Sequence, residues 1–259
     1  MKVNRKKGMI FGVVSALCVG GAFLIKGCAS HPDIPEDMRA WRIGVVSPSF
    51  YPVRVQQAYG VNDRYNWTSL THGFNALWRK GTLDNVRKRL PDYDGFSIPL
   101  HAAATSMQGQ VMPAKILPDS IYLYWASLAE GKFYATKFDL SPALKQQMMT
   151  QERYIRPSGA DGGGCYQIDV LFGLLPGGDA KVWLSGCGMV YTYIDKIKPA
   201  VTAITDRSGA GVDNFQYKGP IERALQRAAD NGVTLFPVPW DKVDQVSRSN
   251  ASILQYYSE

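Results

Sequence analysis

Histidine and cysteine are scarce in this chain of 259 residues, with three and four copies respectively. The histidines form no HExxH motif, and the chain contains no GxSxG turn and no Walker phosphate loop. The sequence therefore predicts no catalytic residue and no cofactor, and the cysteines have too few neighbouring ligands for a metal site. An unrecognised hydrolase that uses His72 or His101 in a spatially assembled Ser-His-Asp set remains an alternative.

Acidic residues are absent before Cys28, whereas five basic residues precede it. These are Lys2, Arg5, Lys6, Lys7 and Lys26. The whole chain has a net charge of +7, but without these five it has 24 basic and 22 acidic residues, a net charge of +2. Most of the basic excess therefore lies in a targeting segment, and the sequence gives no support for a nucleic-acid partner.

Residues 8–25 are a run of 18 residues without a charge, and they follow a cationic start. This pattern is typical of a secretory signal and is also just long enough for a membrane span. In either case the cationic flank stays in the cytoplasm and the body is delivered across the inner membrane. We therefore predict an exported protein.

The end of this run decides how the protein is attached. Ile25, Gly27 and Cys28 match the pattern for lipoprotein cleavage, whereas Lys26 stands where a small side chain is usual. We predict that Cys28 is lipidated. Because Ala29 rather than an aspartate follows it, we expect an outer-membrane lipoprotein that faces the periplasm. An uncleaved inner-membrane anchor and cleavage after Ala29 are the alternatives.

The predicted domain organisation has three parts. Residues 1–27 are a lipoprotein signal peptide, and residues 28–40, which are polar and contain two prolines, are a flexible tether. No internal repeat or low-complexity block follows. We therefore predict that residues 41–259 form a single domain.

Runs rich in aromatic and β-branched residues predict the strands of this domain. They lie at residues 41–46, 51–58, 120–127 and 132–140, with a proline-containing edge strand at 234–240. Helices are predicted at 82–90 with Thr82 as the cap, at 142–151 with Ser141 as the cap, and from Pro220 to Asp230. The buried residues of the last helix are predicted to be Ile221, Leu225 and Ala228.

The segment 165–190 predicts a β-hairpin that turns at residues 176–178, Pro-Gly-Gly. A three-residue loop places apolar residues opposite apolar ones, whereas a two-residue loop sets them against polar ones. The favoured register pairs Val170 with Leu184, Phe172 with Val182 and Leu174 with Ala180. The elements together predict an α+β fold: mainly antiparallel, sandwich-like β-sheet with a few short helices, preceded by the N-terminal signal or anchor segment.

Cys165 and Cys187 are the two thiols of the exported body, where oxidation is expected. In the favoured register they lie on the polar face as diagonal neighbours, about 7–8 Å apart, which is too far for a disulfide without local adjustment. Gly186 and Gly188 flank Cys187 and permit a bulge that closes the gap. We predict the disulfide, with two reduced, partly buried thiols as the alternative.

Two glycine-rich stretches, residues 158–165 and 206–214, are predicted to be flexible connections rather than phosphate-binding loops. The first runs into a strand, and no clear helix follows the second. A dense basic cluster is predicted to be a solvated helix face, with anionic lipid or an acidic partner as the alternative. It consists of Arg79, Lys80, Arg87, Lys88 and Arg89.

Residues 41–53, 117–149 and 167–186 resemble uncharacterised bacterial lipoproteins grouped as domain of unknown function 2931. The most specific marks are Tyr124-Trp125 with Ser127, Ser141-Pro142, and Pro176-Gly177-Gly178 with Val182-Trp183. The resemblance covers most of residues 41–240. It implies an envelope lipoprotein and supports lipidation of Cys28, and it carries over no catalytic residue.

We expect a membrane-tethered periplasmic lipoprotein that acts by protein binding. Lipoproteins of this sort look similar in setting to immunity partners of type VI secretion phospholipase effectors. The predicted partners are therefore the membrane, through the lipid anchor, and a secreted toxin or lipase, or another envelope protein. A structural or assembly lipoprotein of the cell envelope is the alternative.

Overall fold

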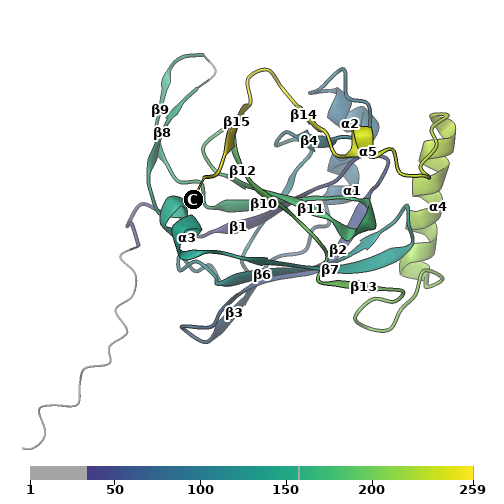
Figure 1. Ribbon diagram of the computed structural model, residues 1–259, viewed down its shortest axis with the longest axis horizontal. Helices are drawn as coiled ribbons and strands as arrows, with labels where there is room; N and C mark the ends of the chain where they lie inside the picture. Colours follow the sequence, from purple (N-terminus) through teal and green to yellow (C-terminus); the bar gives the residue numbers. More distant parts are fainter. Residues whose placement is uncertain (1–33, 157, 259) are drawn as a thin grey trace, which may run out of the picture. The chain divides into compact units, whose positions relative to one another are not determined.

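The computed structural model describes residues 34–156 and 158–258, so Cys28, the predicted lipidation site, and His31 lie outside the described residues. Strands dominate the described chain, and most of them belong to two sheets (Figure 1). The larger sheet contains β1 (Arg42–Val46), β5 (Ser106–Gly109), β10 (Asp169–Leu174), β11 (Ala180–Ser185), β12 (Val190–Ile197) and β15 (Ile253–Tyr256). The other contains β2 (Val53–Asn62), β3 (Trp67–Leu70), β6 (Ser120–Ser127), β7 (Lys132–Asp139) and β13 (Val201–Ala203).

The strand order is β15-β12-β11-β10-β1-β5 in the six-stranded sheet and β13-β7-β6-β2-β3 in the five-stranded sheet. Two small sheets pair β4 (Ile98–Leu100) with β14 (Val246–Arg248) and β8 (Glu152–Ile155) with β9 (Asp161–Cys165). Pairing is antiparallel except between β1 and β10, β12 and β15, and β14 and β4. The predicted α+β fold with mainly antiparallel sheet is confirmed.

The main hydrophobic core lies between the two large sheets, as in a sandwich. Val170 and Phe172 of the six-stranded sheet and Leu123 and Trp125 of the five-stranded sheet all have 0% of their surface exposed there. The register predicted for the hairpin of β10 and β11 is confirmed, with Val170 opposite Leu184 and Phe172 opposite Val182. A hydrogen bond from Leu175 N to Asp179 O closes the three-residue turn, at 2.9 Å.

The other face of β10 and β11, which the sequence analysis predicts to be polar, is buried as well. Leu171 and Trp183 point into a second core, which the segments around Ile98 and Leu235 cover. A strand that is buried on both faces carries apolar residues on both, so its sequence pattern alone does not reveal the second layer.

The helices are short except for one. They are α1 (Leu77–Lys80), α2 (Leu83–Arg87), α3 (Pro142–Met148), α4 (Phe215–Asp230) and α5 (Trp240–Val243), and the turn at Pro176–Gly178 is a 3₁₀-helix. Ser141 caps α3 as predicted, because its side chain accepts a hydrogen bond from Leu144 N at 3.1 Å. Among residues 34–156 and 158–258, no helix combines the length and the apolar character that a membrane crossing requires.

Helix α4 begins earlier than predicted. Asn214 caps it by accepting a hydrogen bond from Gln216 N, and Pro220 lies inside the helix instead of at its first position. The register of the buried face changes accordingly: Tyr217, Ala224 and Ala228 are buried, while Leu225, predicted to be buried, is 44% exposed. Tyr217 and Ala224 pack on Phe133 and Ala126, so α4 covers the outer face of the five-stranded sheet.

The predicted edge strand at 234–240 is wrong. The segment bends through a cis peptide bond between Phe236 and Pro237 and continues into α5. Leu235 packs into the second core, and its carbonyl accepts a hydrogen bond from the Tyr51 hydroxyl at 2.5 Å. These contacts fix the segment on the body without a strand partner.

The described residues 34–40, which precede the predicted domain start at residue 41, belong to the same compact unit as the body. Met38 is 1% exposed and packs in the main core. The Asp37 carboxylate accepts hydrogen bonds from Gln151 Nε2 at 2.8 Å and from the Tyr166 hydroxyl at 2.7 Å. Residues 34–40, assigned to the tether by sequence, are therefore held against the body.

Candidate functional site

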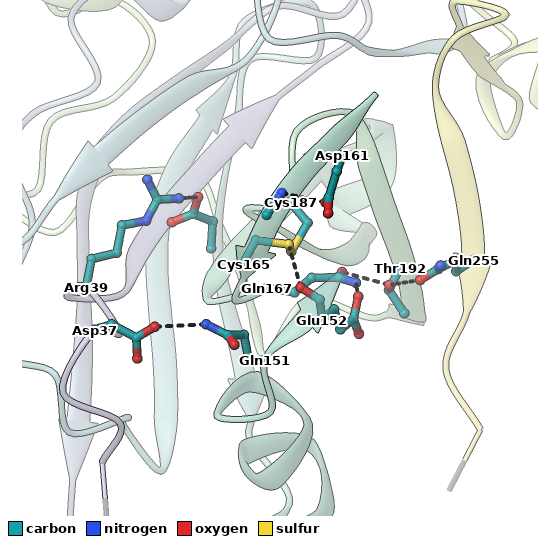
Figure 2. Close-up of a disulfide and its surroundings, with 12 residues drawn as sticks. Asp37, Arg39, Gln151, Glu152, Asp161, Cys165, Gln167, Cys187, Thr192 and Gln255 are labelled. Atoms are coloured by element: carbon teal, nitrogen blue, oxygen red, sulfur yellow. Dashed lines mark hydrogen bonds and ion pairs between the residues drawn. A yellow bond between two sulfur atoms is a disulfide. The ribbon is translucent and has the colours of Figure 1, made fainter. Parts of the chain in front are cut away.

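Cys165 and Cys187 form a disulfide, and their Cα atoms are 5.4 Å apart (Figure 2). The bond joins the end of β9 to the segment between β11 and β12. The β8–β9 hairpin stands at the opposite end of the body from α4 in Figure 1. The disulfide therefore ties the base of this hairpin to the six-stranded sheet.

The predicted placement of the two thiols as diagonal neighbours in one ladder is wrong. β10 begins only at Asp169, and Cys165 pairs instead with Glu152 of β8. After β11 the chain turns at Gly186, whose φ of +133° is open to glycine but not to other residues, and Cys187 becomes buried. The glycine-rich stretch 158–165 thus contains strand β9 instead of a simple flexible connection.

Polar side chains connect the hairpin to the sheet beside the disulfide. Gln167 Nε2 donates to Glu152 Oε2 at 2.8 Å, and the Thr192 hydroxyl donates to Gln167 Oε1 at 2.7 Å (Figure 2). Gln167 and Thr192 are both buried. The disulfide and these hydrogen bonds together fix the β8–β9 hairpin to the six-stranded sheet.

The predicted basic cluster is divided between α1 and the region of α2. Lys80 Nζ donates to Thr105 O at 2.9 Å, and Arg87 Nε donates to Tyr93 O at 2.9 Å. Arg79 lies over the ring of Trp78, at 5.7 Å from its centroid. Two of the five cations therefore stabilise the local fold.

The two candidate histidines have different surroundings. His72 N donates to Gly109 O at 3.0 Å, which fixes its backbone next to β5. Nδ1 of His101 accepts a hydrogen bond from Ala103 N at 3.0 Å. Burial, and then the charge of Arg89, lowers the pKa of His101. That neither histidine is catalytic stays a prediction, with the hydrolase that uses one of them as its alternative.

A groove of about 1050 Å³ lies between α4 and the segment 73–78, with β2 between them. Four arginines line it, and we call it the arginine groove: Arg54 of β2, Arg207 of the loop before α4, and Arg223 and Arg227 of α4. Within the described part of the chain, none of these guanidinium groups has a carboxylate oxygen within the 4.0 Å of an ion pair. Within the described residues, their positive charges are therefore not neutralised by ion pairs.

Arg54 is positioned by the proline inside α4. Pro220 has no N–H to donate to the carbonyl of Gln216, four residues earlier in the helix. Arg54 Nη1 donates to this carbonyl instead, at 2.5 Å, and the guanidinium lies 5.4 Å from the centroid of the Tyr217 ring. The proline that interrupts the helix ladder thereby fixes a cation in the groove.

The loop before α4 supplies Arg207 and the acidic residue of the groove, Asp206. Arg207 donates to Gln57 Oε1 and lies 4.4 Å from the centroid of the Tyr124 ring. The Asp206 carboxylate accepts from Ser208 N and Ala210 N, both within 2.9 Å, and from the Tyr217 hydroxyl at 2.8 Å. Desolvation opposes ionisation, but these hydrogen bonds outweigh it and lower the pKa of Asp206 to about 2. The carboxylate stays ionised and orders the loop.

Contrary to the sequence prediction, a helix does follow the stretch 206–214, because α4 starts at Phe215. Arg223 and Arg227 project from this helix one turn apart. Arg227 Nη1 donates to Ser49 O at 3.3 Å. Burial lowers the pKa of Arg227, and the more distant charge of Asp84 partly offsets this. A half-buried cation without a close carboxylate favours an anionic partner.

Aromatic side chains complete the wall opposite α4. Phe74 and Leu77 anchor this wall in the main core, while Trp78 is 67% exposed at the groove. An exposed tryptophan beside cations is a common anchor in protein interfaces. The sequence analysis predicted none of these groove residues to bind a partner, and it interpreted the stretch 206–214 as a flexible connection. A signal for two of the groove residues was present in the sequence: Arg223 and Arg227 lie four residues apart on one helix face. Such a like-charged pair lowers the stability of the helix unless an anionic group binds beside it.

The comparisons with known proteins give one family. The model of a protein family described as "Protein of unknown function (DUF2931)" matches residues 29–241. The chain belongs to this family. No curated protein and no solved structure gave a match. The matched region of this DUF2931 chain includes the disulfide and the residues of the arginine groove.

Proposed function

We propose that this DUF2931 chain is a lipoprotein of the cell envelope that acts by binding another protein. The observation that carries the proposal is the arginine groove, an open cavity of about 1050 Å³ with four guanidinium groups and an exposed tryptophan. Such groups give specificity and fast association with a partner of opposite charge. The proposal gives the chain no catalytic step.

The proposed location is the periplasmic face of the outer membrane, with attachment through lipidated Cys28. The disulfide supports export, because disulfides persist in the periplasm and are rare in the cytosol. The family match starts at residue 29, next to Cys28. Acyl labelling of the wild type and of Cys28→Ser tests the attachment: label is expected only on the wild type, and label on both contradicts lipidation at this residue.

The candidate partner is a secreted phospholipase delivered by a type VI secretion system, against which the chain acts as an immunity protein. Inhibition is then steric, since a bound protein that covers the active site of the lipase excludes its substrate. Four arginines in the groove favour a lipase that presents an acidic surface.

Co-expression with a phospholipase effector of a type VI secretion system, directed to the periplasm, tests this function. Wild type and Lys218→Glu, an exposed residue of α4 outside the groove, are expected to protect the envelope equally. Arg223→Glu, on the same helix but in the groove, is expected to protect less. Absence of protection by the wild type would contradict the immunity role.

The alternative is a structural or assembly lipoprotein of the envelope. The feature that favours it is the β8–β9 hairpin, which gives the body a second surface at the end opposite α4 (Figure 1). Envelope defects after gene deletion, in a strain that carries no cognate toxin, would favour this role over immunity.

A further inference from the structure

The floor of the arginine groove is the edge of a strand. Six consecutive residues, Pro52 to Gln57, all line it. Side chains of a strand alternate between the two faces of a sheet, so a surface that includes every residue in turn runs along the strand's edge and includes its backbone. The groove therefore follows the edge of β2.

This edge lacks a partner strand within the described residues. β6 pairs with β2 along one side from Val53 to Val61, but on the other side β3 pairs only with Tyr59 to Asn62. After β3 the chain leaves: Thr71 N donates to Ala58 O, and the next residue, His72, donates to Gly109 O in β5. The N-terminal half of β2 is therefore left without a strand partner on this side within the described residues.

The ladder with β6 fixes which backbone groups face the groove. Leu128 N donates to Pro52 O at 3.0 Å, so Pro52 hydrogen-bonds toward β6. In an antiparallel pair every second residue does so, and the backbone N–H and C=O groups of the residues between, Val53 and Val55, point away from β6. The bulge between Val55 and Gln57 shifts the register, so this alternation does not continue past Val55. The N–H and C=O groups of Val53 and Val55 are the ones available to an added strand.

The charges around this edge suit an acidic chain better than a single small anion. Arg54, Arg207 and Arg227 each donate to a different neutral acceptor, the oxygens of Gln216, Gln57 and Ser49 respectively. The acidic residue of the groove, Asp206, already accepts several hydrogen bonds. Carboxylates spread along an extended segment can reach separate guanidinium groups.

We propose that the arginine groove binds an extended, acidic segment of a partner protein, which adds as a strand to the edge of β2 at Val53 and Val55 and places its carboxylates beside Arg207, Arg223 and Arg227. This proposal rests on the proposed protein-binding function and names the site and the chemistry of the partner. Main-chain hydrogen bonds provide affinity in such strand addition, and the flanking side chains provide selectivity.

The test uses the purified full chain in detergent and a capped synthetic peptide in which Glu and Val alternate over eight residues. We expect saturable binding by fluorescence anisotropy, and no binding of the matched Lys and Val peptide. Arg223→Glu is expected to weaken binding roughly tenfold or more, as for loss of a charge-assisted pair, while Lys218→Glu leaves it within about twofold. Unchanged thermal unfolding of both variants serves as the folding control.

N-methylation of the peptide tests strand addition without changing the protein. Methylating alternate amides in one phase removes the N–H groups that pair with β2, and methylating the other phase leaves them free. One of the two methylated peptides is expected to lose binding and the other to keep it. Equal behaviour of the two peptides would overturn strand addition.

Other outcomes separate this inference from the proposed function. Binding of inorganic phosphate or phosphatidylglycerol vesicles at the groove, with no binding of the peptide up to about 1 mM, overturns the acidic-segment proposal in favour of a phosphate ligand. Formation of a complex with the lipase that Arg223→Glu does not weaken overturns this site but leaves the protein-binding function intact. Absence of any protein complex and of protection defeats the function itself.

Discussion

Two groups of arginines in this chain have opposite surroundings. Arg39 and Arg42 both reach the carboxylate of Asp169 in β10, with nitrogen–oxygen distances of 2.8 and 2.6 Å, and Asp169 is 2% exposed. The arginines of the groove are held by carbonyl and amide oxygens and by aromatic rings. The first group neutralises a buried charge of the fold, and the second leaves positive charge at the surface. Substitutions in the two groups should therefore affect different properties.

The largest effect on stability is expected at the paired site. Asp169→Ala removes the acceptor of three charge-assisted hydrogen bonds from Arg39 and Arg42. We expect the free energy of unfolding to fall by about 3 kcal/mol. Urea denaturation measures this, with Asp195→Ala in β12, an exposed acid, as the control. A loss in the control as large as in Asp169→Ala would contradict the assignment.

Removal of the disulfide is expected to have a slightly smaller effect. Cys165 and Cys187 are 22 residues apart, and replacing both with serine lowers the free energy of unfolding by about 2–3 kcal/mol through the restored freedom of the unfolded chain. Because the β8–β9 hairpin, which the disulfide anchors, and α4 lie at opposite ends of the body, the affinity of the groove for the acidic peptide should stay the same (Figure 1). Lost peptide binding in a folded double variant would show that the two regions are coupled.

A helix cap gives an intermediate effect with a matched control. Ser141 accepts from Leu144 N, whereas Thr82, at the corresponding position before α2, makes no side-chain cap hydrogen bond. Ser141→Ala should cost about 1 kcal/mol of unfolding free energy, and Thr82→Ala a few tenths at most. Thermal or urea unfolding of the two variants distinguishes them; equal losses would be inconsistent with the capping geometry.

The smallest stability change is expected in the arginine groove itself. Arg223→Gln should alter the free energy of unfolding by less than about 0.5 kcal/mol, since the side chain has no carboxylate partner in the described chain. The same substitution should weaken binding of the acidic peptide. A loss of stability comparable to that of Asp169→Ala would contradict the claim that the groove arginines, unlike Arg39 and Arg42, contribute little to the stability of the fold.

Acid should loosen the groove loop. The folded-state pKa of Asp206 is about 2, below its ordinary value of 3.8, so its ionised form stabilises the folded loop. This stabilisation is fully present above about pH 4 and is lost as the pH falls toward 2. NMR titration of the Ser208 and Ala210 amides should show a transition near pH 2 that is absent in Asp206→Asn. A midpoint close to 4 would contradict the hydrogen-bond network.

The sequence predicted strand register correctly where only one register places apolar side chains opposite each other. In the hairpin of β10 and β11, a shift by one residue would bury Lys181 in place of Val182, so hydrophobicity alone selects the register. The capped start of α3 was equally readable, because a serine followed by proline is specific for a helix N-terminus. Both are local patterns with one low-energy solution.

The arginine groove was not readable in this way. Its cations come from β2, a loop and α4, and only the tertiary fold brings them together. The sequence also led to the wrong start for α4, because proline is favoured at the first helical position and Pro220 is instead tolerated inside the helix. Arg54 takes the carbonyl that the proline leaves free, a long-range contact that no local rule includes.

The most direct test of the account is amide hydrogen exchange at Val53 and Val55. In the free chain these amides lie on the edge of β2 that no strand of the described residues covers. Binding of the acidic peptide should slow their exchange, while amides of β10 and β11 in the core stay unchanged. Saturating peptide that leaves exchange at Val53 and Val55 unaltered would contradict the claim that a partner docks on this edge.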